Sequence, residues 1–355
     1  MKRLLALFLM ICMVFTLVAC GNSQTPTEPA LQTDPSTDVT EASTEEPTVP
    51  ETTAAEKEYA PLSNGMSGNP NDYDASVPAT NILRNEVQDL FTQEVFEDSE
   101  TGLSLDFNLF LPENYDNGEK YPLVIFMSDS SLVGKAVNAP VIQCRGAMVW
   151  ATASWQEEHP CIIAVPQFNT TIIDDNNGKE EVTEYVAAVR NLILSLSQEY
   201  PVDTDRIYGM GQSMGCMVTM YLCAQYEDLY TACLFVDGQW NIEQLEGLKD
   251  RKFIYFAAEG DAKASAGMAE VKEMLSSSDI SYSDVVWNAK DDQALLNAAA
   301  LEMLSEDNDI NFVSWLIGSV VGKPGEDGGM REHMASFDYA FRQSVLREWL
   351  FIQHK

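Results

Sequence analysis

Short apolar runs and amphipathic runs alternate along this chain from about residue 85 onward. Continuous apolar runs such as Tyr121–Met127 and Cys161–Pro166 are typical of strands buried on both faces of a sheet. Other segments place apolar side chains three or four residues apart, and Glu181–Glu199 is the clearest example. The pattern therefore predicts strands and helices in alternation.

The remaining elements follow the same order. Further strands are predicted at 90–96, 103–111, 206–210, 232–236, 252–258 and 282–287, and residues 310–317 form either a strand or an insertion. Helices are predicted at 139–157, 214–226, 242–248, 266–277, 291–304 and 334–353. Alternation of this kind indicates an α/β fold, with a mostly parallel sheet covered by helices on both faces. The first two strands are joined so closely that we expect an antiparallel edge at the N-terminal side.

The N-terminal 84 residues lack this pattern. Residues 1–19 resemble a bacterial lipoprotein signal peptide: a basic start, a short apolar run, and Leu17-Val18-Ala19-Cys20. The resemblance implies cleavage before Cys20, lipidation of its thiol, and a protein anchored to the outer face of the bacterial cytoplasmic membrane. The alternative is an ordinary secretory signal. Residues 20–84 are rich in Thr, Glu and Pro and predict a disordered tether, which leaves 85–355 as the catalytic domain.

The net charge of the chain limits the classes of partner that it can bind. The chain has 21 basic and 55 acidic residues, for a net charge of −34, which argues against nucleic acid and against anionic membrane surfaces. We therefore expect membrane contact only through the lipid anchor.

Five cysteines follow Cys20 along the chain. All five lie in apolar surroundings and are predicted to be buried free thiols. They are Cys144, Cys161, Cys216, Cys223 and Cys233.

One stretch carries a chemical signature. Gly211-Gln212-Ser213-Met214-Gly215 is a G-x-S-x-G sequence between a strand-like and a helix-like run. This is the context of a nucleophile elbow, where a sharp turn pushes the serine out at the top of a sheet. The glycines are required because a side chain would collide with the neighbouring strand and helix. The alternative is that two glycines flank a serine by chance.

A serine nucleophile needs a histidine base, and the chain has three histidines. His159 precedes a strand and so belongs at its amino end, whereas chemistry in parallel α/β sheets gathers at the carboxyl ends. His354 is next to the C-terminus and should be frayed. His333 follows a glycine-rich acidic loop and opens the last helix, so it is the predicted base. The alternative is a surface histidine at a helix start.

The third member should be a carboxylate that follows a strand between Ser213 and His333. Asp261 is the leading candidate, because it lies just past the strand at 252–258. Asp237 is the rival, one strand earlier, and Glu259 is the third choice. Ser213, Asp261 and His333 occur in the chain order of α/β-hydrolase triads.

Four residues are predicted to complete the site. The backbone N–H of Met214 and one from the loop 128–134, represented by Asp129, should form the oxyanion hole. Gln212 and Trp240 are predicted to line the substrate pocket. For Trp240, core packing is the alternative.

From about residue 90, the chain resembles secreted α/β-hydrolases grouped with predicted peptidases of prolyl-oligopeptidase type, polyhydroxybutyrate-depolymerase-like proteins and feruloyl or acetylxylan esterases. The resemblance rests on seven short segments. These are 121–126, 159–161, 164–167, 205–208, 211–215, 238–240 and 349–351. It implies the α/β-hydrolase fold and the serine mechanism. Relatives usually carry His-Gly after the first buried strand, whereas this chain has Ser128-Asp129, whose carboxylate could disfavour an oxyanion nearby.

These observations predict a surface-anchored serine hydrolase, and an esterase acting on small-molecule or polysaccharide-linked esters is the leading hypothesis. A peptidase of prolyl-oligopeptidase type is the first alternative, although 355 residues leave no room for the propeller domain of full-length prolyl oligopeptidases. A non-catalytic binding lipoprotein that keeps the fold is the second. No cofactor signature is present. Three scattered histidines do not give zinc-site spacing, so no metal is expected.

Overall fold

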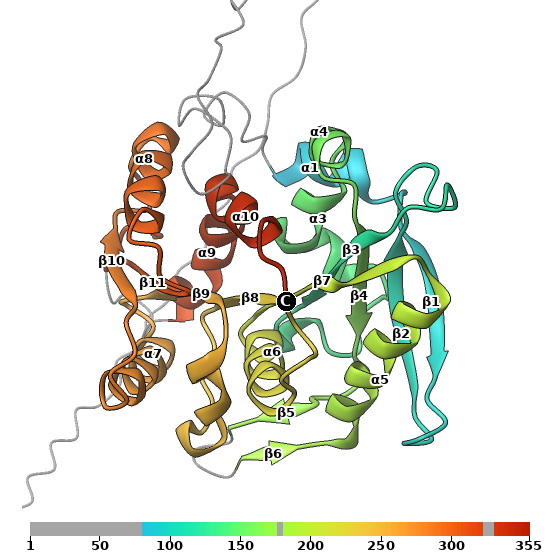
Figure 1. The fold of residues 1–355 in the computed structure, drawn as a ribbon, viewed down its shortest axis with the longest axis horizontal. Helices are drawn as coiled ribbons and strands as arrows, with labels where there is room; N and C mark the ends of the chain where they lie inside the picture. Colours follow the sequence, from blue (N-terminus) through green and yellow to red (C-terminus); the bar gives the residue numbers. More distant parts are fainter. Residues whose placement is uncertain (1–79, 176–179, 322–329) are drawn as a thin grey trace, which may run out of the picture. The chain divides into compact units, whose positions relative to one another are not determined.

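A nine-stranded sheet organises the computed structural model, which describes residues 80–175, 180–321 and 330–355 (Figure 1). The strand order is β1-β2-β4-β3-β7-β8-β9-β11-β10. The strands are β1 (Thr92–Glu97), β2 (Ser104–Phe110), β3 (Tyr121–Met127), β4 (Ile162–Gln167), β7 (Val202–Gln212), β8 (Ala232–Val236), β9 (Phe253–Ala258), β10 (Ser283–Trp287) and β11 (Ile310–Trp315). Strand β2 pairs antiparallel with both β1 and β4, and the other pairs are parallel. The predicted mostly parallel sheet with an antiparallel N-terminal edge is confirmed.

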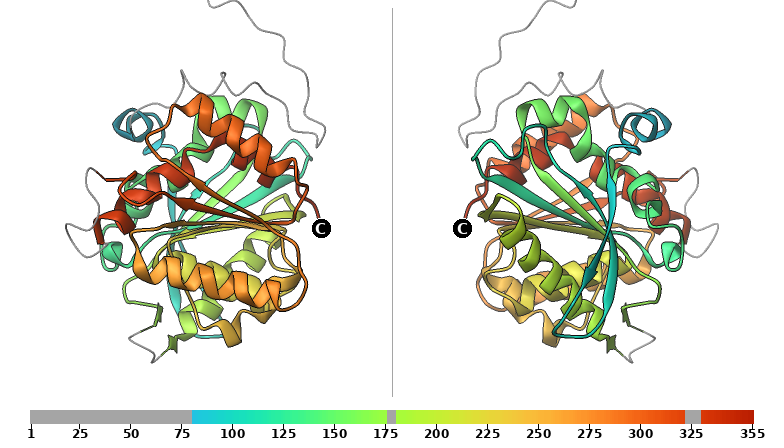
Figure 2. Two further views of the ribbon diagram at one scale, coloured as in Figure 1. Left: turned by 90° about the vertical axis from the view of Figure 1, so that its left-hand side faces the viewer. Right: turned by 90° about the vertical axis from the view of Figure 1, so that its right-hand side faces the viewer.

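Helices cover both faces of this sheet (Figures 1 and 2). One face carries α1 (Thr80–Val87), α3 (Arg145–Ala151), α4 (Ala153–Glu158), α8 (Gln293–Leu304), α9 (Met330–Phe341) and α10 (Ser344–Phe351). The other carries α5 (Glu184–Glu199), α6 (Met214–Gln225) and α7 (Ala262–Ser276). Each layer has its own hydrophobic core against the sheet. The molecule therefore has the two helical layers around a sheet that the alternating pattern predicts.

Strand β3 shows why a continuous apolar run suits this sheet. Its seven residues are all buried. Val124 and Phe126 point into the core under α3 and α9, whereas Leu123, Ile125 and Met127 point into the core under α5 and α6. Side chains alternate because successive residues of a strand face opposite sides. Burying each such side chain favours folding by about 1.5–3 kcal/mol, so both faces must be apolar.

The helix predicted at 139–157 is wrong, because the segment forms three short helices, α2 (Ala139–Ile142), α3 and α4. Cys144 has extended backbone, with φ −142°, and separates α2 from α3. Thr152 separates α3 from α4, where its hydroxyl oxygen accepts from the N–H of Trp155 at 3.3 Å. The second break lies at Thr152 because a threonine side chain that accepts a backbone N–H stabilises the start of a helix. The same hydrogen bond disfavours threonine in the interior of a helix.

Two further helical segments differ from expectation. The single helix predicted at 334–353 is two helices, α9 and α10, with Gln343 in a non-helical conformation between them. The segment 242–248 forms two 3₁₀ helices, η2 (Ile242–Gln244) and η3 (Glu246–Asp250), rather than one short helix. In both cases the apolar positions continue at helical spacing although the chain changes direction, because packing against the rest of the protein sets where each helix ends.

A small antiparallel hairpin, β5 (Ile173–Asp174) with β6 (Glu181–Val182), was not predicted. Its neighbour Asp175 accepts hydrogen bonds from Gln239 at 2.7 Å and from the Lys263 ammonium at 2.9 Å. The lysine and the glutamine tie the hairpin to the start of α7 and to the loop after β8.

The ends of the folded part follow partly from the sequence. Helix α1 begins at Thr80, so it spans the predicted boundary between residues 84 and 85. The predicted signal peptide, most of the tether and the glycine-rich loop at 322–329 lie outside the described residues. Within the described part, the helices are too short or too polar to cross a membrane. All five predicted thiols are buried and free, as expected.

Candidate active site

Ser213 lies at a strained turn between β7 and α6. Its backbone has φ 51° and ψ −117°, a region that non-glycine residues seldom occupy. A Cβ on Gly211 would lie 2.3 Å from the carbonyl carbon of Gly215, and one on Gly215 would lie 2.1 Å from the carbonyl oxygen of Met127 in β3. Both glycines are therefore required by close backbone approach, which is the geometry predicted for a nucleophile elbow.

His333 bridges Ser213 and Asp261. Its Nε2 lies 2.9 Å from Oγ of Ser213, and its Nδ1 lies 2.5 Å from Oδ2 of Asp261. The serine comes from the turn before α6, the aspartate from the turn after β9, and the histidine from the first turns of α9. Three segments separated by 72 and 120 positions along the chain thus converge at one end of the sheet. The three residues that the sequence singled out are brought together.

Asp261 is fixed before it meets the imidazole. Its Oδ1 accepts from the backbone N–H groups of Lys263 and Ala264, each at 3.2 Å, so the side chain caps α7. The carboxylate accepts but does not donate, so Nδ1 of His333 carries the proton. Nε2 is then free to accept the proton of the Ser213 hydroxyl. This is the tautomer that a general base requires.

The charges around His333 favour its protonated form. Burial lowers the pKa of His333, but the hydrogen bond to Asp261 and the charges of Asp237, Asp261 and Asp129 outweigh burial and raise the pKa above its ordinary value. The ring also packs edge-on against Phe337, with centroids 5.1 Å apart. An imidazole that gains a proton from serine would be stabilised here.

The two rival carboxylates have other partners. Glu259 accepts from the backbone N–H of Ile317 at 2.9 Å. Asp237 is fully buried and accepts from the N–H of Ala258 at 2.8 Å and from the hydroxyl of Ser336. Of the three candidates, Asp261 is the one hydrogen bonded to His333. Ser336 has no sequence signal of its own; its position one turn after His333 is the only hint.

Backbone contacts set the geometry of the predicted oxyanion hole. Met214 is the first residue of α6, so its N–H has no acceptor within that helix. The N–H of Gly215 donates to the carbonyl of Ser128 at 3.0 Å, which fastens the loop after β3 to the first turn of α6. Asp129 follows directly in that loop and is buried. The two predicted donors therefore belong to segments held against each other.

The carboxylate of Asp129 is surrounded by donors. It accepts from the backbone N–H of Ser131 at 2.9 Å and from the amides of Gln143 and Gln212 at 2.5 and 2.9 Å. The thiol of Cys144 in turn donates to Gln212 at 3.0 Å. Sequence reasoning missed Gln143, because it lies in a helical run with no local sign of a polar role. The network offsets the negative charge that the Ser128-Asp129 departure brings.

Gln212 and Trp240 are placed inside the protein. Gln212 has no exposed surface, and both ends of its amide are hydrogen bonded to protein groups. Trp240 is 3% exposed, donates to Gln244 at 2.9 Å and packs edge-on against Tyr221. The expectation that these two line a substrate pocket does not fit this placement. Gln212 instead orients Asp129, and Trp240 takes the core-packing alternative.

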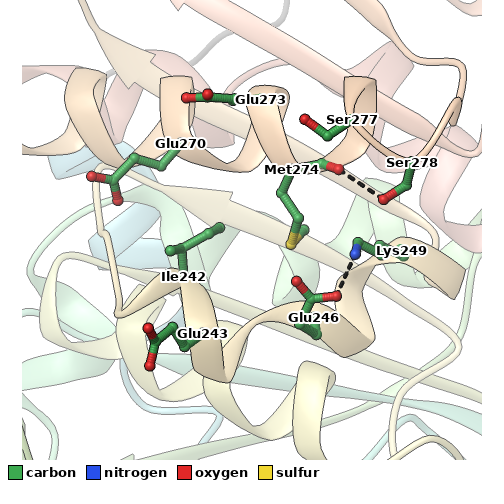
Figure 3. A pocket seen from close by; sticks show the side chains of 9 residues that line it. All are labelled: Ile242, Glu243, Glu246, Lys249, Glu270, Glu273, Met274, Ser277 and Ser278. Carbon is green, nitrogen blue, oxygen red and sulfur yellow. Dashed lines mark hydrogen bonds and ion pairs between the residues drawn. The ribbon is translucent and has the colours of Figure 1, made fainter.

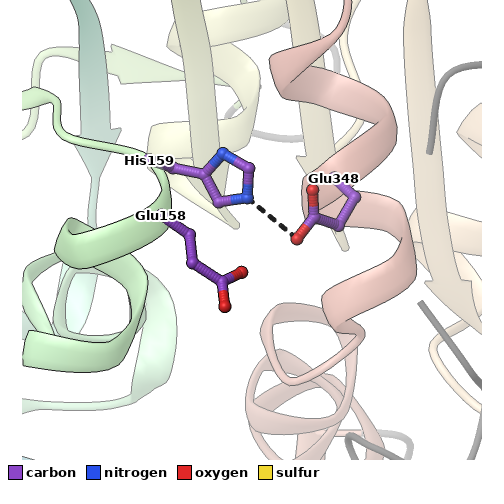
Figure 4. A group of neighbouring side chains, drawn as sticks. All are labelled: Glu158, His159 and Glu348. Atoms are coloured by element: carbon purple, nitrogen blue, oxygen red, sulfur yellow. Dashed lines mark hydrogen bonds and ion pairs between the residues drawn. The ribbon is translucent and has the colours of Figure 1, made fainter. Parts of the chain in front are cut away.

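The other histidines lie away from Ser213. His159 follows α4 and precedes β4, at the amino end of the sheet, and pairs with Glu348 at 3.0 Å (Figure 4). His354 is exposed beside the C-terminus. The ligand atoms of Glu158, His159 and Glu348 lie within 4.8 Å of one another, a spacing that a metal ion could bridge. The same spacing in Asp237, Asp261 and His333 is not identified as a metal site, because both imidazole nitrogens already form hydrogen bonds.

A surface cavity of about 330 Å³ lies between the 3₁₀ helices η2–η3 and α7 (Figure 3). Four carboxylates line it, with the Lys249 ammonium paired to one of them. They are Glu243, Glu246, Glu270 and Glu273. No member of the Ser213–His333–Asp261 group is among its lining residues, so this cavity is not the site of the chemistry.

Comparison with known proteins agrees with the geometry. Residues 167–290 match the Prolyl oligopeptidase family, Peptidase_S9. Among curated proteins, none matches the sequence. A thermostable esterase superposes with a TM-score of 0.59 at 22% identity, over 76% of this chain and 64% of that one. The chain thus spans less than two thirds of that esterase, and a likeness at this identity shows the shared fold.

Two further solved structures are similar at lower scores. A feruloyl esterase module from Clostridium thermocellum, complexed with sinapinate, gives a TM-score of 0.48 at 14% identity, over 75% of this chain and 89% of that one. An S-formylglutathione hydrolase from Agrobacterium tumefaciens gives 0.45 at 12% identity, over 75% and 96%. The strand order, the superposition at a TM-score of 0.59 and the serine at its strained turn agree, and the chain has the α/β-hydrolase fold.

Proposed function

We propose that this protein is a carboxylic-ester hydrolase in which Ser213 is the nucleophile, His333 the base and Asp261 the residue that orients the base. The observation that carries the proposal is the continuous chain of contacts from Asp261 through His333 to Ser213, at 2.5 and 2.9 Å. The esterase named in the superposition with a TM-score of 0.59 supports ester substrates. Small-molecule and polysaccharide-linked esters are the proposed classes.

The chemistry follows from the contacts. Oγ of Ser213 attacks the carbonyl carbon of the ester while its proton moves to Nε2 of His333. The oxyanion that forms is stabilised by the N–H of Met214 and by a second donor, proposed to be the N–H of Asp129. Collapse releases the alcohol, which takes the proton from His333, and leaves the acyl group on Ser213. Water then repeats the two steps and releases the acid.

Turnover of p-nitrophenyl acetate by the purified full chain tests the proposal. Ser213→Ala should lower kcat by about 10,000-fold or more, because both steps need the hydroxyl. Ser197→Ala is the matched control. Ser197 is half-buried on α5 and its hydroxyl donates to the carbonyl of Ile193, so this substitution should leave kcat unchanged. Equal turnover by wild type and Ser213→Ala would refute the assignment.

A peptidase is the second candidate, favoured by the match of residues 167–290 to the Prolyl oligopeptidase family. An amide is harder to cleave than an ester because its leaving group must be protonated as it departs, a step that His333 could also serve. Comparing kcat/KM for a p-nitrophenyl ester with that for a p-nitroanilide peptide separates the two. Preference for the anilide would replace the esterase proposal.

A non-catalytic binding lipoprotein is the remaining alternative. Its motivation was the Asp129 carboxylate beside the predicted oxyanion hole. The hydrogen bonds from Ser131, Gln143 and Gln212 occupy the oxygens of this carboxylate, so its charge is less able to repel an oxyanion. They weaken the case for a non-catalytic protein. An intact protein with no turnover and no reaction of Ser213 with a fluorophosphonate would favour this alternative.

We also propose that the protein is exported and held on the outer face of the bacterial cytoplasmic membrane by a lipid on Cys20. The support is the basic start at Lys2 and Arg3, the apolar run and the Leu17–Cys20 sequence. Cys20→Ala should abolish incorporation of an alkyne fatty acid, whereas Cys12→Ala, within the apolar run, should not. Equal labelling of both variants would remove the anchor from the proposal.

A further inference from the structure

Asp237 is a second buried carboxylate next to the triad. It directly follows β8, has no exposed surface and adopts a positive φ of 43°. One of its carboxylate oxygens, one oxygen of Asp261 and a ring nitrogen of His333 lie within 4.8 Å of one another. A non-glycine residue in this conformation carries a strain of the order of 1–3 kcal/mol, which the surroundings must offset. The mechanism proposed above makes no use of Asp237.

Two donors hold this carboxylate. Oδ1 accepts from the N–H of Ala258, the last residue of β9, at 2.8 Å. Oδ2 accepts from the hydroxyl of Ser336, which is buried in α9 one turn after His333. The oxygen of Ser336 also lies 2.9 Å from the carbonyl oxygen of His333. Asp237 and Ser336 therefore connect the ends of β8 and β9 to the turn of helix that carries the base.

The hydroxyl of Ser336 has one proton and two possible acceptors. When Asp237 is ionised, the serine donates to its carboxylate. When Asp237 is protonated, the acid donates to Oγ of Ser336, and the serine proton turns to the carbonyl of His333. The link between Asp237 and α9 is kept in both states, but Asp237 adds its negative charge to that of Asp261 near the imidazole in only one of them.

The surroundings place this change near neutral pH. Burial raises the pKa of Asp237 to about 7, and the charge of Asp261 adds to that rise, whereas Ser336, His333 and the N–H of Ala258 oppose it. The titratable groups that face Asp237 are Asp261, His333, Tyr255 and Cys216. The charge of Asp129 also raises the pKa of His333.

We propose that Asp237 is a positioning residue that, through Ser336, fastens the His333 turn of α9 and, when ionised, favours the protonated imidazole. The inference rests on the proposed function, because His333 is the base whose position and charge are set. It assigns the strained, buried aspartate a part in the reaction without contact to the substrate.

Two variants separate fastening from charge. Asp237→Asn keeps both links, since its oxygen can accept from Ala258 and its amide can donate to Ser336, but it removes the charge. Asp237→Ala removes the two links as well as the charge. Asp338→Asn is the matched control: it removes a negative charge from the same helix, but Asp338 accepts from the N–H of Arg145 and is not among the groups that shift the pKa of His333.

The first measurement is an NMR titration of the imidazole of His333, which is tractable because the chain has three histidines. The pKa of His333 should fall by roughly half a unit or more in Asp237→Asn and stay unchanged in Asp338→Asn. The second is p-nitrophenyl acetate turnover. Plateau kcat should fall about tenfold in Asp237→Ala with little change in KM, and Asp237→Asn should recover most of it.

An unchanged pKa of His333 in Asp237→Asn, or a plateau kcat of Asp237→Ala equal to that of wild type, would overturn the inference. If Asp237→Ala does not fold, the fold-preserving Asp237→Asn decides through the titration alone. If the wild type shows no turnover, the proposed function fails, whereas the titration still tests the link between Asp237 and His333 because it requires no catalysis.

Discussion

In the part of the chain that the structure describes, two histidines pair with carboxylates at opposite ends of the sheet, and one of these pairs meets a serine. At the carboxyl end, His333 pairs with Asp261 at 2.5 Å and reaches Ser213 with its other nitrogen. At the amino end, His159 pairs with Glu348 at 3.0 Å. The ring of His159 packs against Trp155 and Phe351, with centroid distances of 4.5 and 5.7 Å.

The difference shows that the pair itself does not specify chemistry. His159 closes an aromatic cluster, so its role is packing and a partly exposed hydrogen bond with Glu348. His333 sits where the backbone is strained, with positive φ at both Ser213 and Asp237, and where a helix begins at Asp261. Backbone strain is a cost that a purely structural pair does not need, and the capping of α7 by Asp261 fixes the carboxylate that faces His333.

The largest contrast should come from neutralising each carboxylate. Asp261→Asn should lower kcat about 10,000-fold, because the amide can donate to Nδ1 and force the proton onto Nε2, which then cannot act as a base. Glu348→Gln makes the same change at the other pair and should leave kcat within about twofold. Steady-state turnover of p-nitrophenyl acetate measures both. Comparable losses in the two variants would contradict the distinction between the pairs.

The next contrast is in pH dependence. Since neighbouring carboxylates raise the pKa of His333 above 6.5, the acid limb of kcat/KM should lie above pH 6.5. Below it, activity should fall about tenfold per pH unit, because only the neutral imidazole accepts a proton. Protonated His333 also stabilises the fold; that contribution is complete below about pH 6.5 and is lost as the pH rises through the folded-state pKa.

Glu348→Gln serves as the control for the pH profile, since it changes the charge beside a different histidine. Its acid limb should coincide with that of the wild type. A wild-type limb at or below pH 6, or one that moves in Glu348→Gln, would show that His333 is not the group that titrates.

The smallest effect should come from removing the packing histidine. His159→Ala should lower the free energy of unfolding by about 1–3 kcal/mol, because it removes a ring from the Trp155 and Phe351 contacts and leaves the buried Glu348 without its partner. Turnover should be unchanged. Urea unfolding measures the loss, with exposed His354→Ala as the control. A large loss of kcat in His159→Ala without unfolding would contradict a packing role.

Much of this arrangement could be predicted from the sequence because it rests on local patterns. The buried strands showed as apolar runs, and the residues of β8 (Ala232–Val236) agree fully with the prediction. Ser213 was visible because Gly211 and Gly215 must flank it. His333 followed by elimination from three histidines, and Asp261 from its position after a strand.

What the sequence could not show depends on contacts between distant segments. Gln212 looked like a pocket residue, but its burial and its hydrogen bond to Asp129 arise only when β7 packs beside β3. Ser336 gains its role from Asp237, 99 positions away. The breaks at Thr152 and Gln343 reflect where helices must turn to cover the sheet, which a helical stripe does not encode.

The central claim is that Ser213 is activated by His333, and the site of fluorophosphonate labelling tests it most directly. The full chain should gain a single phosphonyl adduct, with loss of fluoride, on the tryptic peptide that contains Ser213. His333→Ala should slow this labelling at least about a hundredfold, and His159→Ala should not slow it. An adduct elsewhere, or equal labelling rates in the two histidine variants, would contradict the account.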